Sequence, residues 1–132
     1  MKKILILLLF SIIIFNSCKK DSSNPVNTDT VPATPTLLQP TNISTGIAVS
    51  PNLSWNPSNG ATSYTLQISI ISSFTSFVYN QSGITSTSQE VTTLSPLTIY
   101  FWRVCATNSY GTSDWSTARS FTTKGIPPDT PI

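Results

Sequence analysis

The chain has 132 residues, of which seven are basic, five are acidic and none is histidine, and its formal net charge is +2. This length suits one small domain with flanking segments. The lack of histidine removes the commonest general base and the commonest zinc ligand, which counts against hydrolase and metal-enzyme functions.

The N-terminal residues 1–17 have the pattern of an export signal. Lys2 and Lys3 precede an apolar run at residues 4–15, which is interrupted only by Ser11. A helix that spans the hydrocarbon core of a bilayer needs about 20 residues, so a permanent membrane span is not expected here. Residues 1–17 are therefore predicted to be a lipoprotein signal peptide.

The end of this signal, Phe15-Asn16-Ser17-Cys18, resembles a lipobox, the processing site of bacterial lipoproteins. The resemblance implies cleavage before Cys18, a diacylglyceryl thioether on the Cys18 sulfur, and stable anchoring to a membrane. It places the protein in the cell envelope, at the outer membrane or the cell surface. Ordinary secretory cleavage, with Cys18 as an incidental residue, is the alternative.

Processing also changes the charge and the cysteine count. Without Lys2 and Lys3, five basic residues balance five acidic residues, so the mature chain is neutral. A neutral chain lacks the electrostatic footprint of a nucleic-acid-binding protein. With Cys18 used by lipid, Cys105 remains alone and no intrachain disulfide is expected. We interpret Cys105 as a small residue that fills a strand position; an intermolecular disulfide or a reactive thiol is the alternative.

Residues 18–33 are predicted to be the lipidated Cys18 and a disordered tether. The segment is rich in Lys, Asp, Ser, Asn, Thr and Pro and has no apolar periodicity, so it cannot bury enough surface to offset the entropy of ordering. Within it, Asp29-Thr30-Val31 resembles an Asp-Thr-aliphatic O-glycosylation site of some Gram-negative envelope systems. Thr30 is therefore a candidate modification site.

A domain is predicted over residues 34–123, where short apolar runs alternate with polar residues. Apolar and polar residues alternate strictly at 64–70 and mostly at 100–106. A period of two marks half-buried strands, and the turn-forming stretches 56–60 and 108–111 separate them. Several short strands at this spacing predict an all-β fold built as an antiparallel sandwich.

Four segments in this domain resemble, in order, parts of a fibronectin type III domain. Residues 51–57 resemble strand B, residues 60–69 the B–C loop and strand C, residues 94–104 the E–F corner and strand F, and residues 106–123 the F–G ending. The resemblance implies a seven-stranded antiparallel immunoglobulin-like β-sandwich. Tyr100 then occupies the tyrosine-corner position, whose hydroxyl bonds back to the backbone.

The alternation also predicts the core and one irregularity. The expected core side chains are Leu53, Trp55, Tyr64, Leu66, Ile68, Val91, Leu94, Tyr100, Trp102, Val104 and Phe121. Strict alternation backward from Phe121 would bury Arg119 on the inner face, which is too costly for an unpaired charge. A bulge or slip is therefore predicted between Trp115 and Phe121. The stretch Ser113-Asp114-Trp115-Ser116 resembles half of the Trp-Ser-x-Trp-Ser motif of cytokine receptors, and no function is transferred from it.

No catalytic, cofactor-binding or metal site is predicted, and no cofactor is expected. Glu90 and Asp114 are the only carboxylates of the domain and lie on different predicted elements, which counts against a paired-carboxylate hydrolase. No Gly-rich phosphate loop and no cluster with metal-ligand spacing is present in the sequence. The aromatic residues Tyr110 and Trp115, in and after the predicted F–G loop, form a candidate contact patch for protein or sugar. Phe74, Phe77 and Tyr79, around the predicted C–C′ turn, are further candidates. Ordinary packing is the alternative for all five.

The sequence favours a lipid-anchored, non-catalytic cell-envelope protein whose domain is a protein- or glycan-binding or adhesion module. Its expected partners are the membrane, through lipid on Cys18, and a protein or polysaccharide. The alternative is a passive structural spacer, or a truncated remnant of a larger multidomain surface protein, because the Pro-rich tail at residues 124–132 resembles a linker.

The topology of such a sandwich also predicts its orientation. An odd number of strands that run up and down places the two chain ends at opposite poles. The B–C loop near Asn59 and the F–G loop near Tyr110 are then expected at the pole of the tether, while the 94–96 corner and Ile132 lie at the far pole.

Overall fold

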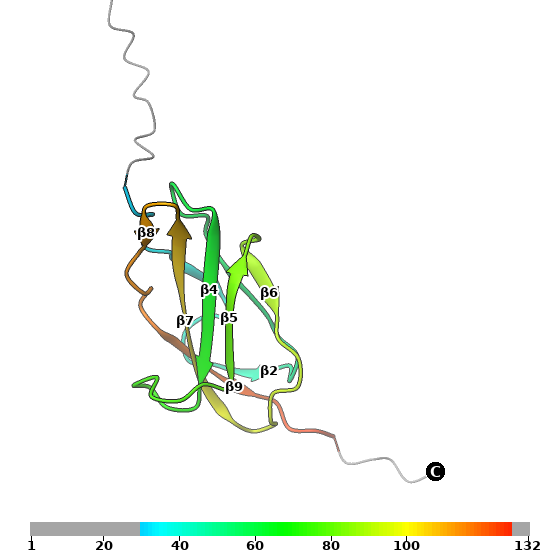
Figure 1. Cartoon of the computed structure of the whole chain (residues 1–132). Coiled ribbons are helices and arrows are strands. Elements are labelled where there is room, and N and C mark those ends of the chain that lie inside the picture. Colours follow the sequence, from blue (N-terminus) through cyan, green and yellow to red (C-terminus); the bar gives the residue numbers. More distant parts are fainter. Residues whose placement is uncertain (1–29, 128–132) are drawn as a thin grey trace, which may run out of the picture.

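The computed structural model describes residues 30–127, which fold into nine β-strands in two sheets (Figure 1). The strands are β1 (Leu37–Gln39), β2 (Ser44–Ile47), β3 (Asn52–Trp55), β4 (Ser63–Ser69), β5 (Tyr79–Ile84), β6 (Ser88–Glu90), β7 (Ile99–Asn108), β8 (Gly111–Thr112) and β9 (Arg119–Thr123). Within the described part of the chain, no helix is long and apolar enough to cross a membrane.

The two sheets face each other as a sandwich. The smaller sheet has the order β1-β3-β6, and the larger has the order β2-β9-β7-β4-β5, with β8 paired to β7. The predicted all-β, immunoglobulin-like sandwich is confirmed. It has nine strands where seven were expected, because the first strand is divided into β1 and β2 and the last into β8 and β9. It also departs from a purely antiparallel arrangement, since β2 pairs with β9 in parallel. The reason is that residues 40–43 carry the chain from β1 in one sheet to the edge of the other, where it runs alongside β9.

Apolar side chains between the sheets form the core, and every predicted core residue lies in it. Trp102 on β7 is fully buried, and the rings of Trp55 and Tyr64 meet edge to face with their centroids 5.5 Å apart. Such a pair contributes about 0.5–1.5 kcal/mol beyond the area that it buries. Leu37 and Ile84 also belong to this core. The alternation missed them because they lie on short or mostly exposed strands.

The corner between β6 and β7 is a tyrosine corner, as predicted. The backbone N–H of Ser95 donates to the hydroxyl oxygen of Tyr100 at 2.9 Å. The Tyr100 ring packs on Phe121 of β9, with 5.7 Å between ring centroids. This bond and this ring contact fix the connection that returns the chain from the smaller sheet to the larger one.

The N-terminal segment lies against the loops at one end of the sandwich, called here the tether pole. The Ala33 N–H donates to the Asn59 carbonyl at 3.1 Å, and the Asn108 side-chain amide donates to the Thr30 carbonyl at 2.8 Å. The B–C and F–G loops therefore share the pole of the incoming chain, as predicted. Residues 30–33, which we assigned to the tether, are held by the domain because these loops supply partners for their backbone groups.

The chain leaves at the opposite end, called here the distal pole (Figure 1). There β9 ends at Thr123, whose hydroxyl donates to the Ser95 carbonyl at 2.7 Å. The 94–96 corner and the exit of the chain thus lie together, as predicted. Ile132 is outside the described residues.

Candidate functional site

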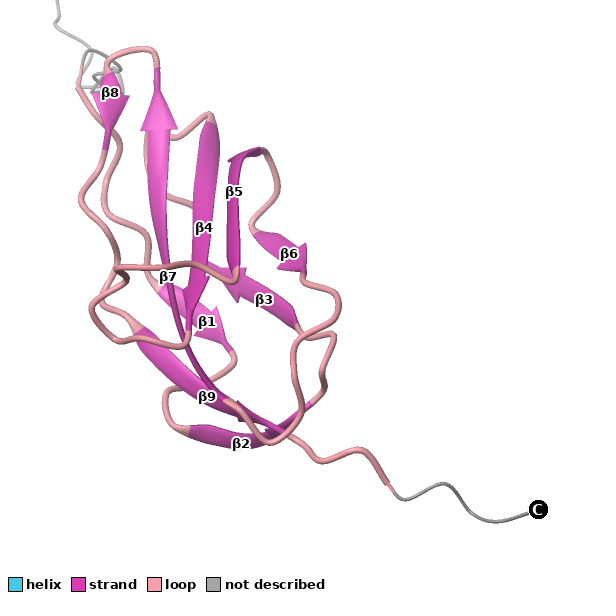
Figure 2. Cartoon of the chain, turned by 60° about the horizontal axis from the view of Figure 1, so that its bottom comes forward, coloured by secondary structure: helices cyan, strands magenta, loops and turns pink. Residues whose placement is uncertain are grey.

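The β4–β5 connection at residues 70–78 is a long loop at the distal pole that folds back across the outer face of the larger sheet (Figure 2). Two local bonds shape its start, because the Ile71 N–H donates to Ser69 Oγ at 2.9 Å and the Phe74 N–H donates to the Ile71 carbonyl at 3.0 Å. They aim the Phe74 ring at Arg103, which projects outward from β7 between the inward residues of that strand.

The guanidinium of Arg103 is the centre of a small cluster on this outer face. Its Cζ lies 4.1 Å from the centroid of the Phe74 ring and 4.3 Å from that of the Trp115 ring. Its Nε donates to Gln67 Oε1 of β4 at 2.9 Å. Burial lowers the pKa of Arg103, but a guanidinium keeps its charge at neutral pH. The cluster therefore ties three parts of the chain together through one cation.

Two serines position Trp115 in this cluster. The Val104 N–H donates to Ser116 Oγ at 3.1 Å, and the Ser116 N–H donates to the Val104 carbonyl at 2.9 Å. Ala106 and Ser113 exchange the same two bonds at 3.0 and 2.8 Å. The half-motif from which we transferred nothing thus has a structural role here, since its serines bond to β7 on both sides of the stacked tryptophan.

The irregular stretch at residues 113–118 ends where β9 begins, at Arg119. The expected irregularity is present, but it does not remove Arg119 from the inner side, because Arg119 stays in register with Trp102. Its Nη1 reaches the open edge between the sheets and donates to the carbonyls of Leu38 at 2.8 Å and Pro40 at 3.4 Å. The charge that we judged too costly to bury is half-exposed and hydrogen-bonded.

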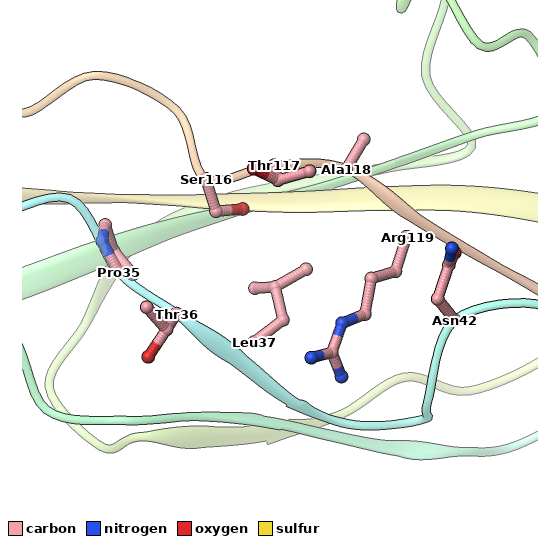
Figure 3. A pocket seen from close by; sticks show the side chains of 8 residues that line it. All are labelled: Pro35, Thr36, Leu37, Asn42, Ser116, Thr117, Ala118 and Arg119. Carbon is pink, nitrogen blue, oxygen red and sulfur yellow. The ribbon is translucent and has the colours of Figure 1, made fainter.

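A groove of about 280 Å³ lies beside this arginine, between β1 and the stretch before β9 (Figure 3). Its lining residues are Pro35, Thr36, Leu37, Asn42, Ser116, Thr117, Ala118 and Arg119. Ser116 Oγ already accepts a backbone N–H, and Asn42 Oδ1 accepts the N–H of Ser120 at 2.9 Å. Arg119 is the one ionisable residue in this lining, so the groove offers no acid–base pair for catalysis.

The sequence-predicted contact residues have different surroundings. Tyr110 is exposed in the β7–β8 turn at the tether pole, where its N–H donates to Asn108 Oδ1 at 2.8 Å. Trp115 is half-buried, and its ring is engaged by Arg103 within the molecule. Thr30, the candidate glycosylation site, is exposed. Cys18, the candidate lipidation site, lies outside the described residues.

The remaining candidate groups do not combine into a reactive centre. Cys105 is free and buried, and its burial raises the pKa of the thiol. Glu90 ends β6 in the smaller sheet, whereas Asp114 precedes Trp115 beside the larger one. Among residues 30–127, no three His, Cys, Asp or Glu residues lie close enough to hold a metal ion.

An exposed apolar surface lies on the β4–β5 loop, where the sequence indicated Phe77 as a candidate contact residue but not its three aliphatic neighbours. Ile70, Ile71, Phe77 and Val78 are 54, 41, 43 and 50 % exposed. We call these four side chains the distal apolar patch. Ile70 continues the alternation of β4, so the sequence alone does not distinguish it from a core residue.

Comparison with known proteins identifies the domain. Residues 39–125 match the Rha78A-like N-terminal immunoglobulin domain. The chain belongs to this family. No curated protein matches the chain.

Solved structures similar to this Rha78A-like domain include three of different origin. A Fn3-like protein from Clostridium thermocellum is 24 % identical, with 75 % of this chain and 100 % of that chain covered and a TM-score of 0.58. The fibronectin type III domain of human fibronectin type III domain containing protein 3 is 27 % identical, with 77 % and 95 % covered and a TM-score of 0.55. The Streptomyces avermitilis alpha-L-rhamnosidase complexed with L-rhamnose is 21 % identical, with 71 % of this chain but 10 % of that chain covered, and a TM-score of 0.53.

Proposed function

We propose that this protein is a non-catalytic binding module of the cell envelope, held at a membrane by lipid on Cys18, which contacts a protein or glycan partner through its distal pole. The observation that carries the proposal is the separation of the two ends of the domain. The N-terminal segment is bound at the tether pole, and the distal apolar patch is at the other end.

The non-catalytic part of the proposal rests on how the polar groups of the domain are used. The hydroxyl oxygens of Ser113 and Ser116 accept backbone N–H groups of β7, and neither serine has a histidine to activate it. The Cys105 thiol is buried, and its pKa is raised, which disfavours the nucleophilic thiolate. These groups support the fold and are not arranged for a reaction.

The binding part rests on the distal apolar patch and on the loop that carries it. Phe74 stacks on Arg103 and Ile71 is bonded to Ser69, so both ends of the turn are attached to the sheet. A loop fixed in this way presents its exposed apolar side chains in one arrangement, and a partner pays less ordering entropy when it binds a pre-organised surface. Such a surface is expected in a binding module and is unnecessary in a passive spacer.

One of the similar solved structures bears on the glycan part of the proposal. Immunoglobulin-like domains of this type occur as a small part of a rhamnosidase, an enzyme whose solved structure contains L-rhamnose. We therefore retain a glycan, as well as a protein, as a candidate partner of this chain.

The test is site-specific crosslinking of the full chain in the cells that carry it. A photoreactive amino acid replaces Phe77 in the patch, and a matched variant carries it at Thr45, which is exposed on β2. We expect a discrete adduct from position 77 and none from position 45, and digestion with protease or glycosidase identifies the adduct as protein or glycan. Absence of an adduct at position 77, with the protein present on the membrane, would favour the passive spacer.

A further inference from the structure

We propose that the groove beside Arg119 is a binding site for an acidic sugar, a hexuronate unit of a glycan whose carboxylate pairs with the Arg119 guanidinium. The proposal goes beyond the proposed function, because the groove shares no residue with the distal apolar patch. Three properties of the groove support it. They are the open edge of the arginine, a surplus of hydrogen-bond donors in the lining, and the size of the space.

One edge of the Arg119 guanidinium is held by backbone, and the other edge is open. Nη1 donates to the carbonyls of Leu38 at 2.8 Å and Pro40 at 3.4 Å. Nε and Nη2 donate to no other group among residues 30–127. These two groups present parallel N–H donors, the fork that binds both oxygens of a carboxylate. The bonds to β1 fix the direction of this fork, so less ordering entropy is lost when a carboxylate binds.

No acidic side chain neutralises this cation. The lining contains no Asp or Glu. Glu90 ends β6, which lies at the other edge of the smaller sheet from β1, and Asp114 forms no ion pair within the described part of the chain. A charge beside low-dielectric protein walls is screened less than a charge in open water. The groove therefore favours an anionic occupant.

The other polar side chains of the lining leave donors over. Asn42 Oδ1 already accepts the Ser120 N–H at 2.9 Å. Ser116 Oγ and Thr36 Oγ1 likewise accept N–H groups, at 3.1 and 2.8 Å. Asn42 Nδ2 and the two hydroxyl protons donate to no group that the structure describes. Together with the open fork of the arginine, they make a lining that suits an occupant rich in acceptors.

A sugar fits this lining better than a peptide does. A peptide backbone brings one N–H donor for each residue, and the β1 carbonyls that would accept such donors, on Leu38 and Pro40, are occupied by Arg119. The ring and hydroxyl oxygens of a sugar accept hydrogen bonds from several directions. Its C–H face packs on apolar side chains, which Leu37 and Pro35 supply in the same lining.

The volume of the groove limits the occupant to about one sugar unit. The space measures about 280 Å³. Pockets for drug-sized ligands measure about 300–1,000 Å³, so this groove lies at the lower end of the range. It opens to solvent between β1 and the stretch before β9, so further units of a glycan can continue outward from the bound one (Figure 3). The site thus recognises a single uronate unit of a longer chain.

A titration followed by NMR tests the site in the chain from residue 18 onward, carrying Cys18→Ser. The probes are methyl glucuronide and methyl galacturonide, each compared with the neutral glycoside that has CH₂OH in place of the carboxylate. We expect one uronide or both to shift the Arg119 Nε–H and the Asn42 side-chain amide in a saturable way, with a millimolar dissociation constant. The neutral glycoside should bind about ten-fold more weakly, because it lacks the charge-assisted bonds.

Three variants test the residues of the groove. Asn42→Asp keeps the oxygen that accepts the Ser120 N–H but replaces the donor Nδ2 by a second oxygen, so it should abolish uronide binding. Arg119→Lys keeps the charge but loses the fork, and it should weaken binding about ten-fold. Asn80→Asp makes the same change of charge on β5, at the far edge of the larger sheet, and should bind like the parent chain. Circular dichroism separates a lost site from a lost fold.

Four results would overturn the proposal. No saturable shift with either uronide would mean that the groove is not a sugar site. Equal affinity for a uronide and its neutral glycoside would contradict the pairing with Arg119, and unchanged binding by Asn42→Asp would place the uronide elsewhere. A glycine–glutamate–glycine peptide that binds as tightly as the uronide would assign the groove to acidic peptides. The contact proposed for the distal apolar patch is independent of these results, because its crosslinking test uses Phe77.

Discussion

The Arg103 cluster predicts a measurable coupling between side chains that are distant in the sequence. Its guanidinium contacts two rings at 4.1 and 4.3 Å and donates one hydrogen bond to Gln67. A cation–π contact contributes about 1 kcal/mol when it is partly shielded from water. A hydrogen bond of this kind adds roughly 1 kcal/mol. Arg103→Ala should therefore lower the free energy of unfolding by about 3 kcal/mol.

The assay is urea denaturation of a double-mutant cycle. Arg103→Met and Trp115→Leu are measured singly and together, and their coupling should be about 1 kcal/mol. A matched cycle between Arg103 and Leu97, which is exposed at the distal pole, should give a coupling near zero. Arg103→Lys keeps the charge but loses the planar stacking and the bond to Gln67, so it should still destabilise the fold. A coupling near zero for the Trp115 pair, or a neutral Arg103→Lys, would refute the reasoning.

Three further predictions follow from the anchor, the core and the buried thiol. Cys18→Ala should abolish fatty-acid labelling and membrane fractionation, and retention of both would disprove the anchor. Trp102→Ala should lower the free energy of unfolding, measured by denaturant titration, by about 3–5 kcal/mol. Phe101→Ala, at a half-buried position, should lower it much less, and equal losses would contradict the assigned inner and outer faces of β7. Burial raises the pKa of the Cys105 thiol, so the folded state favours the neutral thiol and is stabilised by it. This contribution to the free energy of unfolding is complete below the unfolded-state pKa and is lost as the pH rises through the folded-state pKa. Native protein should resist alkylation at neutral pH, whereas rapid labelling would contradict this burial.

The parts of the fold that could be predicted are those with a local signal. Strands β4 and β7 have one face in the core over seven and ten residues, so period two is visible in their sequence. Strands β1, β2 and β8 have two to four residues, which is too short for a period to be seen. The parallel pairing of β2 with β9 joins segments far apart in the chain, and no local pattern encodes it.

The candidate site was harder to predict for the same reason. The cost of burying Arg119 was judged from its own strand, while the carbonyls that accept its N–H groups lie about 80 residues earlier, on Leu38 and Pro40. Trp115 was expected to be a contact residue because it is an aromatic that follows the predicted F–G loop, and its contact with Arg103 has no signal in the sequence. The sequence pattern can predict a strand, but it does not show which side chains the fold brings together across strands.

The arrangement of the two poles leads to a last prediction, on how the domain stands at a lipid surface. The incoming chain is bonded to Asn59 at the tether pole, and Lys124 follows β9 at the distal pole. The strand between them, β7, has ten residues and spans about 33 Å at ~3.3 Å per residue. The twelve residues from 18 to 29 reach at most about 40 Å when fully extended, which is only slightly more than this span. We therefore expect the tether pole to lie nearer the lipid than the distal pole on average.

Single cysteines at Asn59 and at Lys124 measure this asymmetry in lipidated protein on vesicles, in a Cys105→Ser background. A lipid-borne quencher should reduce the fluorescence of a probe at Asn59 more than that of a probe at Lys124, because the anchor restrains the tether pole directly and the distal pole only through the length of the domain. Equal quenching of both probes would mean that the domain tumbles freely on its tether, and the separation of the poles would then not decide which end a partner meets. Stronger quenching at Lys124 would reverse the orientation and place the distal apolar patch against the lipid.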